Sequence, residues 1–233
     1  MFDVIVVGGG PAGSSAAHFN AIKGKKVLLI EKNTFPRDKI CGDGVTGKSL
    51  AILDEMGLSD NIKKIKKISC QEVILSSPDK TTLKIPISSP EDPFTAFCIE
   101  REIFDNILYE KAVSSVLANN GVVINERVSK PLIEKGIMVG VIVDKIEYRG
   151  NLIIGADGFN GPISRYVMEI NQQPKQNRKH YSSAVREYWE NIEDNQGQIE
   201  IHFIEGILPG YFWIFPISEN KFNIGLGMLL DDM

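Results

Sequence analysis

The residues with the clearest chemistry lie near the N-terminus, where Gly8, Gly10 and Gly13 are spaced as G-x-G-x-x-G. In such a loop the first glycine permits a tight turn, the second lets the backbone approach a pyrophosphate, and the third lets a helix pack closely on a strand. Backbone N–H groups from Ala12 onward then stand at a helix N-terminus, which favours phosphate oxygens. Glu31 lies where a carboxylate can accept hydrogen bonds from ribose hydroxyls. The pattern predicts a dinucleotide site, and a plain turn is the alternative.

The elements around this loop are those that a dinucleotide site requires. Residues 2–7 are predicted to form a buried strand, residues 11–24 a helix that ends at Gly24, and residues 25–31 a second buried strand. Together they make a βαβ unit, the start of a doubly wound parallel sheet. A carboxylate at the end of the second strand disfavours a 2′-phosphate, so FAD or NAD fits better than NADP.

A second kind of sheet is predicted later in the chain. Residues 70–77 and 81–87 alternate apolar and polar side chains, which is typical of antiparallel strands with one wet face. A long helix is expected from Arg101 to about Ala118. It is followed by short strands up to residue 155, a helix near 164–168, a polar linker at 171–179 and long strands from residue 182 onward. We therefore expect an α/β protein of two interleaved domains. Their expected ranges are 1–69 and 98–175 for the nucleotide-binding domain, and 70–97 and 176–233 for the antiparallel domain.

Composition and charge exclude several classes of protein. Hydrophobic residues make up 43% and charged residues 24% of the chain, with a net charge of -4, so no basic face for nucleic acid is expected. Three cysteines without a C-x-x-C pair argue against a disulfide framework and against a metal site. No apolar run approaches the ~20 residues that span a bilayer. We expect a cytoplasmic protein; the lysine-rich run 61–68 is either a solvated face or a peripheral contact with an anionic membrane.

The segment 151–161, NLIIGADGFNG, resembles the G-A-D-G segment of flavoproteins with the p-hydroxybenzoate hydroxylase fold. The resemblance implies FAD as the cofactor, with Asp157 near its pyrophosphate and ribose; a helix cap is the alternative reading of Asp157. It also assigns Arg101, in the context ERxxFD, to the cofactor, and a cation at a helix N-terminus suggests an anionic partner. Val128 matches the position whose backbone meets the adenine. Pro162 replaces the family's serine, which suits a first helical turn but predicts a weaker cap.

Two further motifs resemble the geranylgeranyl reductase family. The segment Cys41-Gly42-Asp43-Gly44 is similar to a C-G-x-G loop that lies beside the flavin ring in that family, which makes Cys41, Gly42 and Gly44 candidate cofactor contacts and Cys41 a candidate catalytic residue. A surface turn with an incidental cysteine is the alternative. The second motif matches the family signature Y-x-W-x-F-P…G-x-G, and its members are candidate substrate contacts: Tyr211, Trp213, Phe215, Pro216, Gly225 and Gly227.

Tyr211, Trp213 and Phe215 alternate onto one face of a strand, so they could form an aromatic wall or merely pack in a core. Glycines on the neighbouring strand are expected to leave room for a long, thin apolar ligand.

The resemblance implies an oxidoreductase that reduces carbon–carbon double bonds in isoprenoid lipid chains. Hydride would pass from reduced FAD to one alkene carbon, and a proton would be delivered to the other. Because only the G-x-G-x-x-G segment at residues 8–13 directly follows a predicted strand, whereas the match at residues 42–47 lies in an irregular segment, the electron donor is expected to be external, either NADPH or a ferredoxin-like protein. A monooxygenase or halogenase of the same fold is the alternative reading.

Flavoproteins of this fold carry a third motif, built around Gly-Asp, after the aromatic strand. The sequence ends at Met233, shortly after Gly227, without such a segment. We therefore expect a truncated family member that binds FAD weakly and shows little or no reductase activity. An inactive flavin-binding fragment is the corresponding alternative.

Overall fold

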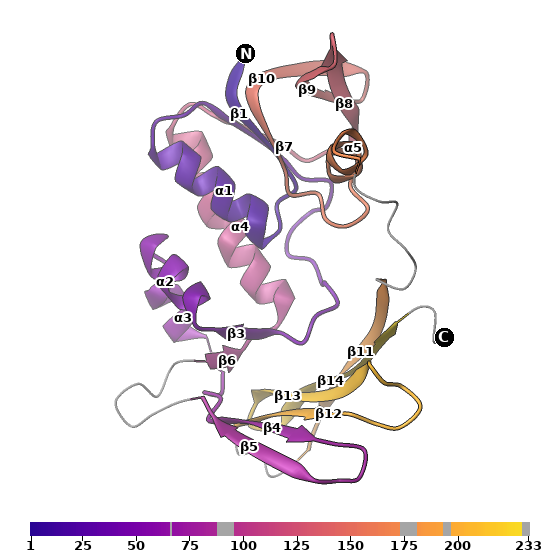
Figure 1. Cartoon of the computed structure of the whole chain (residues 1–233). Coiled ribbons are helices and arrows are strands. Elements are labelled where there is room, and N and C mark those ends of the chain that lie inside the picture. The colour runs from indigo at the N-terminus through magenta and orange to yellow at the C-terminus, as the bar shows by residue number, and fades with distance from the viewer. Residues whose placement is uncertain (66, 88–95, 173–180, 193–196, 230–233) are drawn as a thin grey trace. The chain divides into compact units, whose positions relative to one another are not determined.

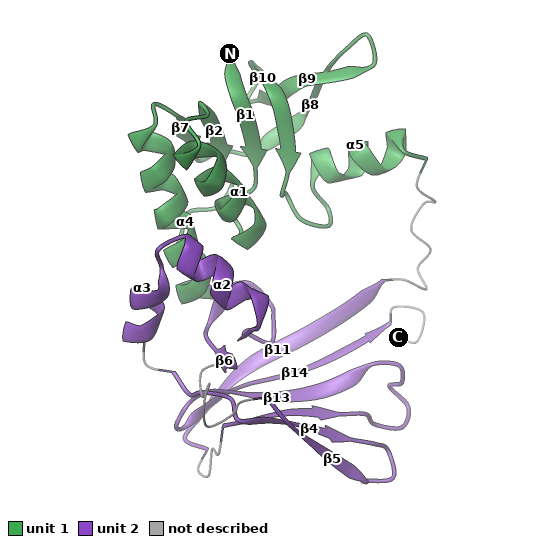
Figure 2. Cartoon of the chain, turned by 60° about the vertical axis from the view of Figure 1, so that its left-hand side comes forward, with its two compact units in different colours: residues 1–37, 102–175 green, residues 38–101, 176–233 purple. Residues whose placement is uncertain are grey.

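The chain divides into two compact units (Figure 2), and the computed structural model describes residues 1–65, 67–87, 96–172, 181–192 and 197–229. Unit 1 comprises residues 1–37 and 102–175, and unit 2 comprises residues 38–101 and 176–233. Both units are discontinuous in sequence. The boundary differs from the expected one because residues 38–69, expected in the nucleotide-binding domain, belong to unit 2.

Unit 1 is built on a six-stranded sheet (Figure 1). The first four strands in sheet order pair in parallel, and the last three form an antiparallel meander. Their order across the sheet is β7 (Val122–Ile124), β2 (Val27–Ile30), β1 (Phe2–Val7), β10 (Ile146–Gly155), β9 (Ile137–Val143) and β8 (Val128–Glu134).

Alternation along β1 explains how unit 1 forms two layers of core. Val4 and Val6 face α1 (Pro11–Ile22) and the helix α4 (Arg101–Ala118), where they pack with buried alanines and valines. Ile5 and Val7 face the opposite side, in a cluster that includes Val141 of β9 and Ile163 of α5 (Pro162–Ile170). Apolar side chains on both faces are typical of a parallel strand covered on both sides.

Unit 2 contains a second six-stranded sheet, which is antiparallel except where β12 and β4 run in parallel. Its order is β11 (Ser182–Glu190), β14 (Lys221–Leu229), β13 (Tyr211–Ser218), β12 (Gln198–His202), β4 (Glu72–Ser76) and β5 (Thr82–Pro86). A small ribbon of β3 (Gly44–Thr46) and β6 (Ala96–Cys98) and the helices α2 (Lys48–Glu55) and α3 (Ser59–Lys64) complete the unit.

The predicted α/β class with a parallel sheet and an interleaved antiparallel sheet is confirmed. The long helix has the predicted bounds, Arg101–Ala118. Residues 146–155, expected as two short strands, form one continuous strand, β10, which joins the parallel and antiparallel parts of the sheet. Most of the expected linker at 171–179 lies outside the described residues.

Candidate functional site

The glycine loop of unit 1 has the conformation that its spacing predicts. Gly8 has φ +102°, and a Cβ there would lie 2.2 Å from the carbonyl oxygen of Ala156. A Cβ on Gly13 would lie 1.7 Å from the carbonyl oxygen of Gly8. No side chain fits at such distances from backbone atoms, so the fold itself requires these two glycines.

Gly10 differs because neither its conformation nor its packing requires a glycine. Its backbone angles (φ -67°, ψ -177°) are open to other residues, and the nearest atom to a Cβ would be Nη2 of Arg37 at 3.5 Å. Gly10 is the N-cap of α1, with Pro11 in the first turn, so the N–H groups of Ala12 and Gly13 lack partners from within the helix. An open backbone at a helix N-terminus fits a bound pyrophosphate.

The buried carboxylate of Glu31 is hydrogen-bonded to the glycine loop. Its Oε2 accepts a hydrogen bond from the backbone N–H of Gly9 at 2.6 Å, and its Oε1 accepts one from the N–H of Asn33 at 2.8 Å. Each carboxylate oxygen keeps a lone pair that a ribose hydroxyl could share. Glu31 therefore orders the glycine loop in addition to the ribose contact predicted for it, which stays a prediction.

Arg37 lies beside this loop and was missed by the sequence reasoning. Its side chain is 17% exposed, and its Nη1 lies 3.1 Å from the fully buried carboxylate of Asp105. That ion pair lacks hydrogen-bond geometry, so Nη1 has no hydrogen-bond partner among the described residues. Arginine recognises phosphate through several fixed donors. The sequence offered one indication of this role, the position of Arg37 between Glu31 and the cysteine motif. That segment has no apolar periodicity from which a structure could be predicted.

Asp157 acts as a helix cap. Its carboxylate accepts hydrogen bonds from the backbone N–H of Ile163 at 2.7 Å and from that of Ser164 at 3.3 Å, in the first turn of α5. The alternative reading as a cap is therefore observed, and it supplies the cap that Pro162 was expected to weaken. A contact between Asp157 and the cofactor stays a prediction.

Two other predicted cofactor residues have structural surroundings of their own. Arg101 begins α4, and together with Arg186 its charge opposes the rise that burial causes in the pKa of Asp43. Val128 begins β8, is 5% exposed and packs in the core of unit 1. The contacts of Arg101 and Val128 with FAD stay predictions.

In unit 2 the Cys41–Gly44 loop lies against the aromatic strand β13. A Cβ on Gly42 would lie 2.8 Å from the ring of Phe215, and one on Gly44 would lie 3.5 Å from it. Cys41 is half-buried and carries a free thiol. Two motifs that are far apart in the sequence are thus in direct contact.

The expected space opposite the aromatic wall is only partly present. Trp213 is 6% exposed, and a Cβ on Gly225 would lie 2.1 Å from its indole ring, so the indole itself fills the space above this glycine. The expectation of room for a ligand is wrong at Gly225, because the missing side chain accommodates Trp213. Gly227 is more open, with its nearest neighbours at 3.7 Å. Tyr211, on the same strand face, is 40% exposed.

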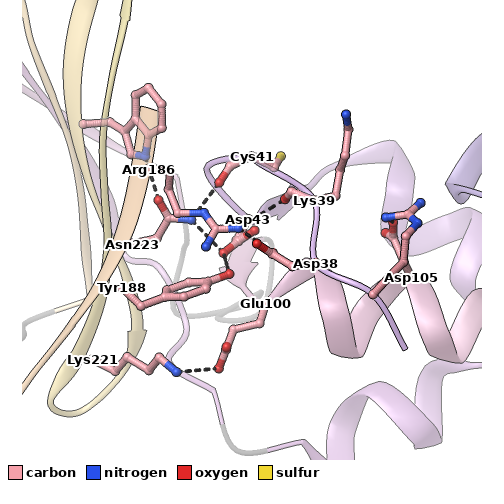
Figure 3. A network of polar contacts seen from close by, with 12 residues as sticks. Asp38, Lys39, Cys41, Asp43, Glu100, Asp105, Arg186, Tyr188, Lys221 and Asn223 are labelled. Carbon is pink, nitrogen blue, oxygen red and sulfur yellow. Dashed lines mark hydrogen bonds and ion pairs between the residues drawn. The ribbon is translucent and has the colours of Figure 1, made fainter. Parts of the chain in front are cut away.

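A buried polar cluster joins the cysteine loop to this sheet (Figure 3). The fully buried Asn223 of β14 donates to the carbonyl oxygen of Cys41 and to Oδ2 of Asp43, both at 2.7 Å, and accepts from Nε1 of Trp213 at 2.8 Å. The Tyr188 hydroxyl also donates to Oδ2 of Asp43, at 2.6 Å. Burial raises the pKa of Asp43, and burial together with the bond to Asp43 raises that of Tyr188. The sequence reasoning missed both Tyr188 and Asn223. The sequence indicates Asn223 only as a polar residue within the apolar run 222–230, and it offers no comparable indication for Tyr188.

Charged side chains hold this cluster on its outer side. The guanidinium of Arg186 lies 4.1 Å from the ring centroid of Tyr188, and its Nη2 donates to Asp38 at 2.5 Å. The Lys221 ammonium lies 4.7 Å from the same centroid and 3.2 Å from the carboxylate of Glu100 (Figure 3). Two cations near one aromatic ring restrict its position.

The lysine-rich run, expected as a solvated face or a membrane contact, is partly structural. Ile62 of α3 is buried, and Nζ of Lys67 donates to the Ile62 carbonyl oxygen at 2.5 Å. Residue 66 lies outside the described part of the run. Among the helices that the structure describes, none has the length and apolar character needed to cross a bilayer.

Residues 1–185 match the family model described as an FAD-binding domain, and residues 180–233 match the geranylgeranyl reductase catalytic domain. The two matches meet at the start of β11. They cover both of the sequence resemblances drawn above, and they confirm the predicted family, the FAD-binding fold and FAD as the cofactor.

Named relatives agree with these matches. A menaquinone reductase of Mycobacterium tuberculosis is 30% identical over 97% of this chain, and digeranylgeranylglycerophospholipid reductase 2 of Methanococcoides burtonii is 32% identical over 98%. The chain spans about half the length of these curated relatives, 55% in both cases. A crystal structure of a geranylgeranyl bacteriochlorophyll reductase-like protein from Thermoplasma acidophilum superposes with a TM-score of 0.80 at 25% identity, covering 99% of this chain and 57% of that one.

Proposed function

Because the chain belongs to the family of proteins with this FAD-binding domain, we propose that it is part of a flavin-dependent reductase that saturates carbon–carbon double bonds in isoprenoid lipid chains. The observation that carries the proposal is the contact between the cysteine loop and the aromatic strand in unit 2. Phe215 packs on Gly42, and Asn223 bonds both Trp213 and the Cys41 backbone. These are the two motifs that resemble the geranylgeranyl reductase family.

In this proposal, unit 1 binds the nucleotide part of FAD. Gly10 and the N–H groups at the N-terminus of α1, which the helix itself does not pair, hold the pyrophosphate, and Glu31 accepts hydrogen bonds from a ribose. Arg37 adds a guanidinium whose Nη1 has no hydrogen-bond partner among the described residues. The remaining assigned contacts, at Asp157, Arg101 and Val128, rest on the resemblance alone.

The residues of unit 2 bind and orient the prenyl chain. When bound and reduced by the external donor, FAD would supply the hydride that an alkene needs in order to be saturated. The protein's aromatic faces exclude water, and each can stabilise positive charge that develops on the alkene by about 0.5–2 kcal/mol when desolvated. Tyr211, which is 40% exposed, is the aromatic side chain of this face that is most open to a ligand.

The finer assignments are part of the same proposal. We infer an external electron donor, NADPH or a ferredoxin-like protein, because only one G-x-G-x-x-G segment, residues 8–13, joins a parallel strand to a helix. A lipid substrate favours a peripheral membrane contact, for which the lysines of the run 61–68 provide positive charge.

The test is an anaerobic turnover experiment on the complete gene product that contains these 233 residues, loaded with FAD. Flavin is reduced with dithionite, a geranylgeranyl phospholipid is added in detergent micelles, and the lipid is analysed by mass spectrometry. We expect the lipid to gain two hydrogens per reduced double bond, whereas free reduced FAD without protein should give none. A chain that holds stoichiometric FAD but leaves the lipid mass unchanged would contradict the proposal.

A parallel assay in air separates this function from a monooxygenase or a halogenase of the same fold. A reductase consumes the electron donor without taking up oxygen in proportion to substrate. Oxygen uptake that matches substrate turnover, with an oxygenated or halogenated product, would assign the chain to the alternative class.

A further inference from the structure

Asn223 occupies a junction between the two motifs of unit 2. It is fully buried, and both of its amide hydrogens and its carbonyl oxygen are used: it bonds the Cys41 carbonyl oxygen, the Asp43 carboxylate and the Trp213 indole N–H. A buried polar group that loses its partner is costly, because it cannot regain a hydrogen bond to water. A shift of the loop or of the indole would therefore be resisted by the same side chain.

Asp43 is the residue of the loop whose side chain is bonded to the sheet. Its φ is +67°, a left-handed conformation that is uncommon outside glycine but is tolerated by aspartate and asparagine. Its Oδ2 accepts hydrogen bonds from both Tyr188 and Asn223, whereas its buried Oδ1 has no hydrogen-bond partner in the described part of the chain. These two hydrogen bonds, together with the one that its carbonyl oxygen accepts from the N–H of Ile99 at 3.0 Å, hold Asp43 in place.

The loop also packs directly against the aromatic strand β13. The ring of Phe215 lies so close to Gly42 that a Cβ there would approach it to 2.8 Å. The loop is thus held by a van der Waals contact at Gly42 and by hydrogen bonds at Cys41 and Asp43 (Figure 3).

We propose that Asn223, Asp43 and Tyr188 form a clamp of positioning residues that holds the Cys41–Gly44 loop on the aromatic strand, so that one side chain, Asn223, sets the positions of Cys41 and Trp213 together. The clamp follows from the contacts within unit 2. Its meaning for catalysis rests on the proposed function, in which the loop and the strand must keep one geometry.

The experiment measures the rate at which iodoacetamide alkylates the Cys41 thiol in the folded chain. Cys41 is half-buried, whereas Cys70 and Cys98 are fully buried, so peptide mass spectrometry can follow Cys41 by itself. The assay requires neither cofactor nor substrate, so its outcome is independent of whether the proposed function is right.

Two substitutions of Asp43 separate the hydrogen bonds from the backbone conformation. Asp43→Gly accepts the positive φ but removes the carboxylate, and we expect Cys41 alkylation to accelerate about tenfold, the size expected when hydrogen bonds of this kind are lost. Asp43→Asn keeps an acceptor for Tyr188 and Asn223 and also tolerates the conformation, so its rate should stay within about twofold of the unsubstituted chain. Asn220→Ala, at an exposed position in the β13–β14 turn, is the matched control and should change nothing.

Tyr188→Phe and Trp213→Phe extend the test to the other members. Tyr188→Phe removes only the hydroxyl that donates to Asp43, whereas Trp213→Phe removes both the indole N–H that donates to Asn223 and part of the buried ring. We expect about threefold faster alkylation of Cys41 in each, since one donor of the network is lost. Labelling is done well below the melting temperature of every variant, which is recorded alongside.

The proposal fails if Asp43→Gly and Tyr188→Phe are both folded and both alkylate at the unsubstituted rate. It also fails if Asp43→Asn accelerates as much as Asp43→Gly, because the carboxylate charge rather than the hydrogen bonds would then hold the loop. If Asp43→Gly does not fold, the Tyr188→Phe and Trp213→Phe rates decide the question in the same way.

Discussion

At the scale of single residues, Gly10 and Gly13 are alike in the sequence motif and different in the structure. An alanine at Gly10 would make only an ordinary contact with Arg37 at 3.5 Å, whereas one at Gly13 would lie 1.7 Å from the Gly8 oxygen. We predict that Gly10→Ala keeps the stability of the chain and weakens FAD binding about tenfold or more, because the methyl group occupies the approach of the pyrophosphate. Thermal melting and flavin fluorescence titration measure the two effects.

Gly13→Ala is the matched comparison. We predict that it lowers the stability by about 1–3 kcal/mol or more, because the clash is with rigid backbone, and that FAD binding falls only as a consequence. If a folded Gly10→Ala chain binds FAD with unchanged affinity, the prediction that the pyrophosphate binds at this loop is wrong.

The carboxylates illustrate what the sequence could and could not predict at this scale. The position of Glu31 at the end of the second strand predicted a ribose contact, whereas its hydrogen bond with the N–H of Gly9, which orders the glycine loop, was not predicted. Asp157 was predicted beside a ligand, yet its oxygens bond the first turn of α5. An aspartate before a helix serves either purpose with the same local sequence, so only the distances separate the two roles.

At the scale of elements, strands β13 and β14 interlock through a ring and a glycine. Gly225 lies opposite Trp213 in the pairing, and an alanine there would place its Cβ 2.1 Å from the indole. We predict that Gly225→Ala destabilises the chain by about 1–3 kcal/mol, because the buried indole must move off its position. The midpoint of urea unfolding measures this loss.

Gly227→Ala, two residues further along the same strand, provides the control. Its Cβ would have neighbours no closer than 3.7 Å, so we predict a change within about 0.5 kcal/mol. Equal losses in the two variants would mean that a general strand effect, rather than the indole, explains the result.

Element type was largely predictable, and side-chain partners were not. The apolar periodicity of residues 101–118 and the alternation of residues 182–190 gave elements with the observed bounds, Arg101–Ala118 and Ser182–Glu190. Asn223 lies in a strand that was also predicted, but its three hydrogen bonds reach residues 10 to 182 positions away in sequence. Periodicity indicates which residues lie on the same face of one strand or helix, but it does not indicate which residues from distant parts of the sequence they contact.

At the scale of the whole molecule, the chain crosses between its two units three times. Residues 38–69 were predicted with the nucleotide-binding unit because they follow its second strand directly. They belong to unit 2 because β3 pairs with β6 and Asp43 bonds Tyr188 and Asn223. A glycine-rich segment without periodicity offers no apolar face from which such pairing could be predicted.

The buried carboxylate of Asp43 makes the stability of unit 2 depend on pH. Burial raises its pKa from the ordinary value of 3.8, despite the hydrogen bonds from Tyr188 and Asn223 that oppose the rise. Between pH 3.8 and the raised value the folded state holds a proton that the unfolded state has lost. By linkage, the Asp43 contribution to the free energy of unfolding therefore falls as the pH rises through this window.

Asp43→Asn isolates this contribution, because an amide keeps the acceptor and cannot ionise. We predict that the stability of Asp43→Asn relative to the unsubstituted chain is smallest near pH 4, grows as the pH rises and then becomes constant. Both tryptophans of the sequence, Trp189 and Trp213, lie in unit 2, so their fluorescence during urea unfolding reports on the unit that contains Asp43. Taking the difference between the two chains at each pH cancels the titration of all other groups that the substitution does not touch. A difference that shrinks with rising pH would mean that the donors around Asp43 stabilise its charge more than burial penalises it.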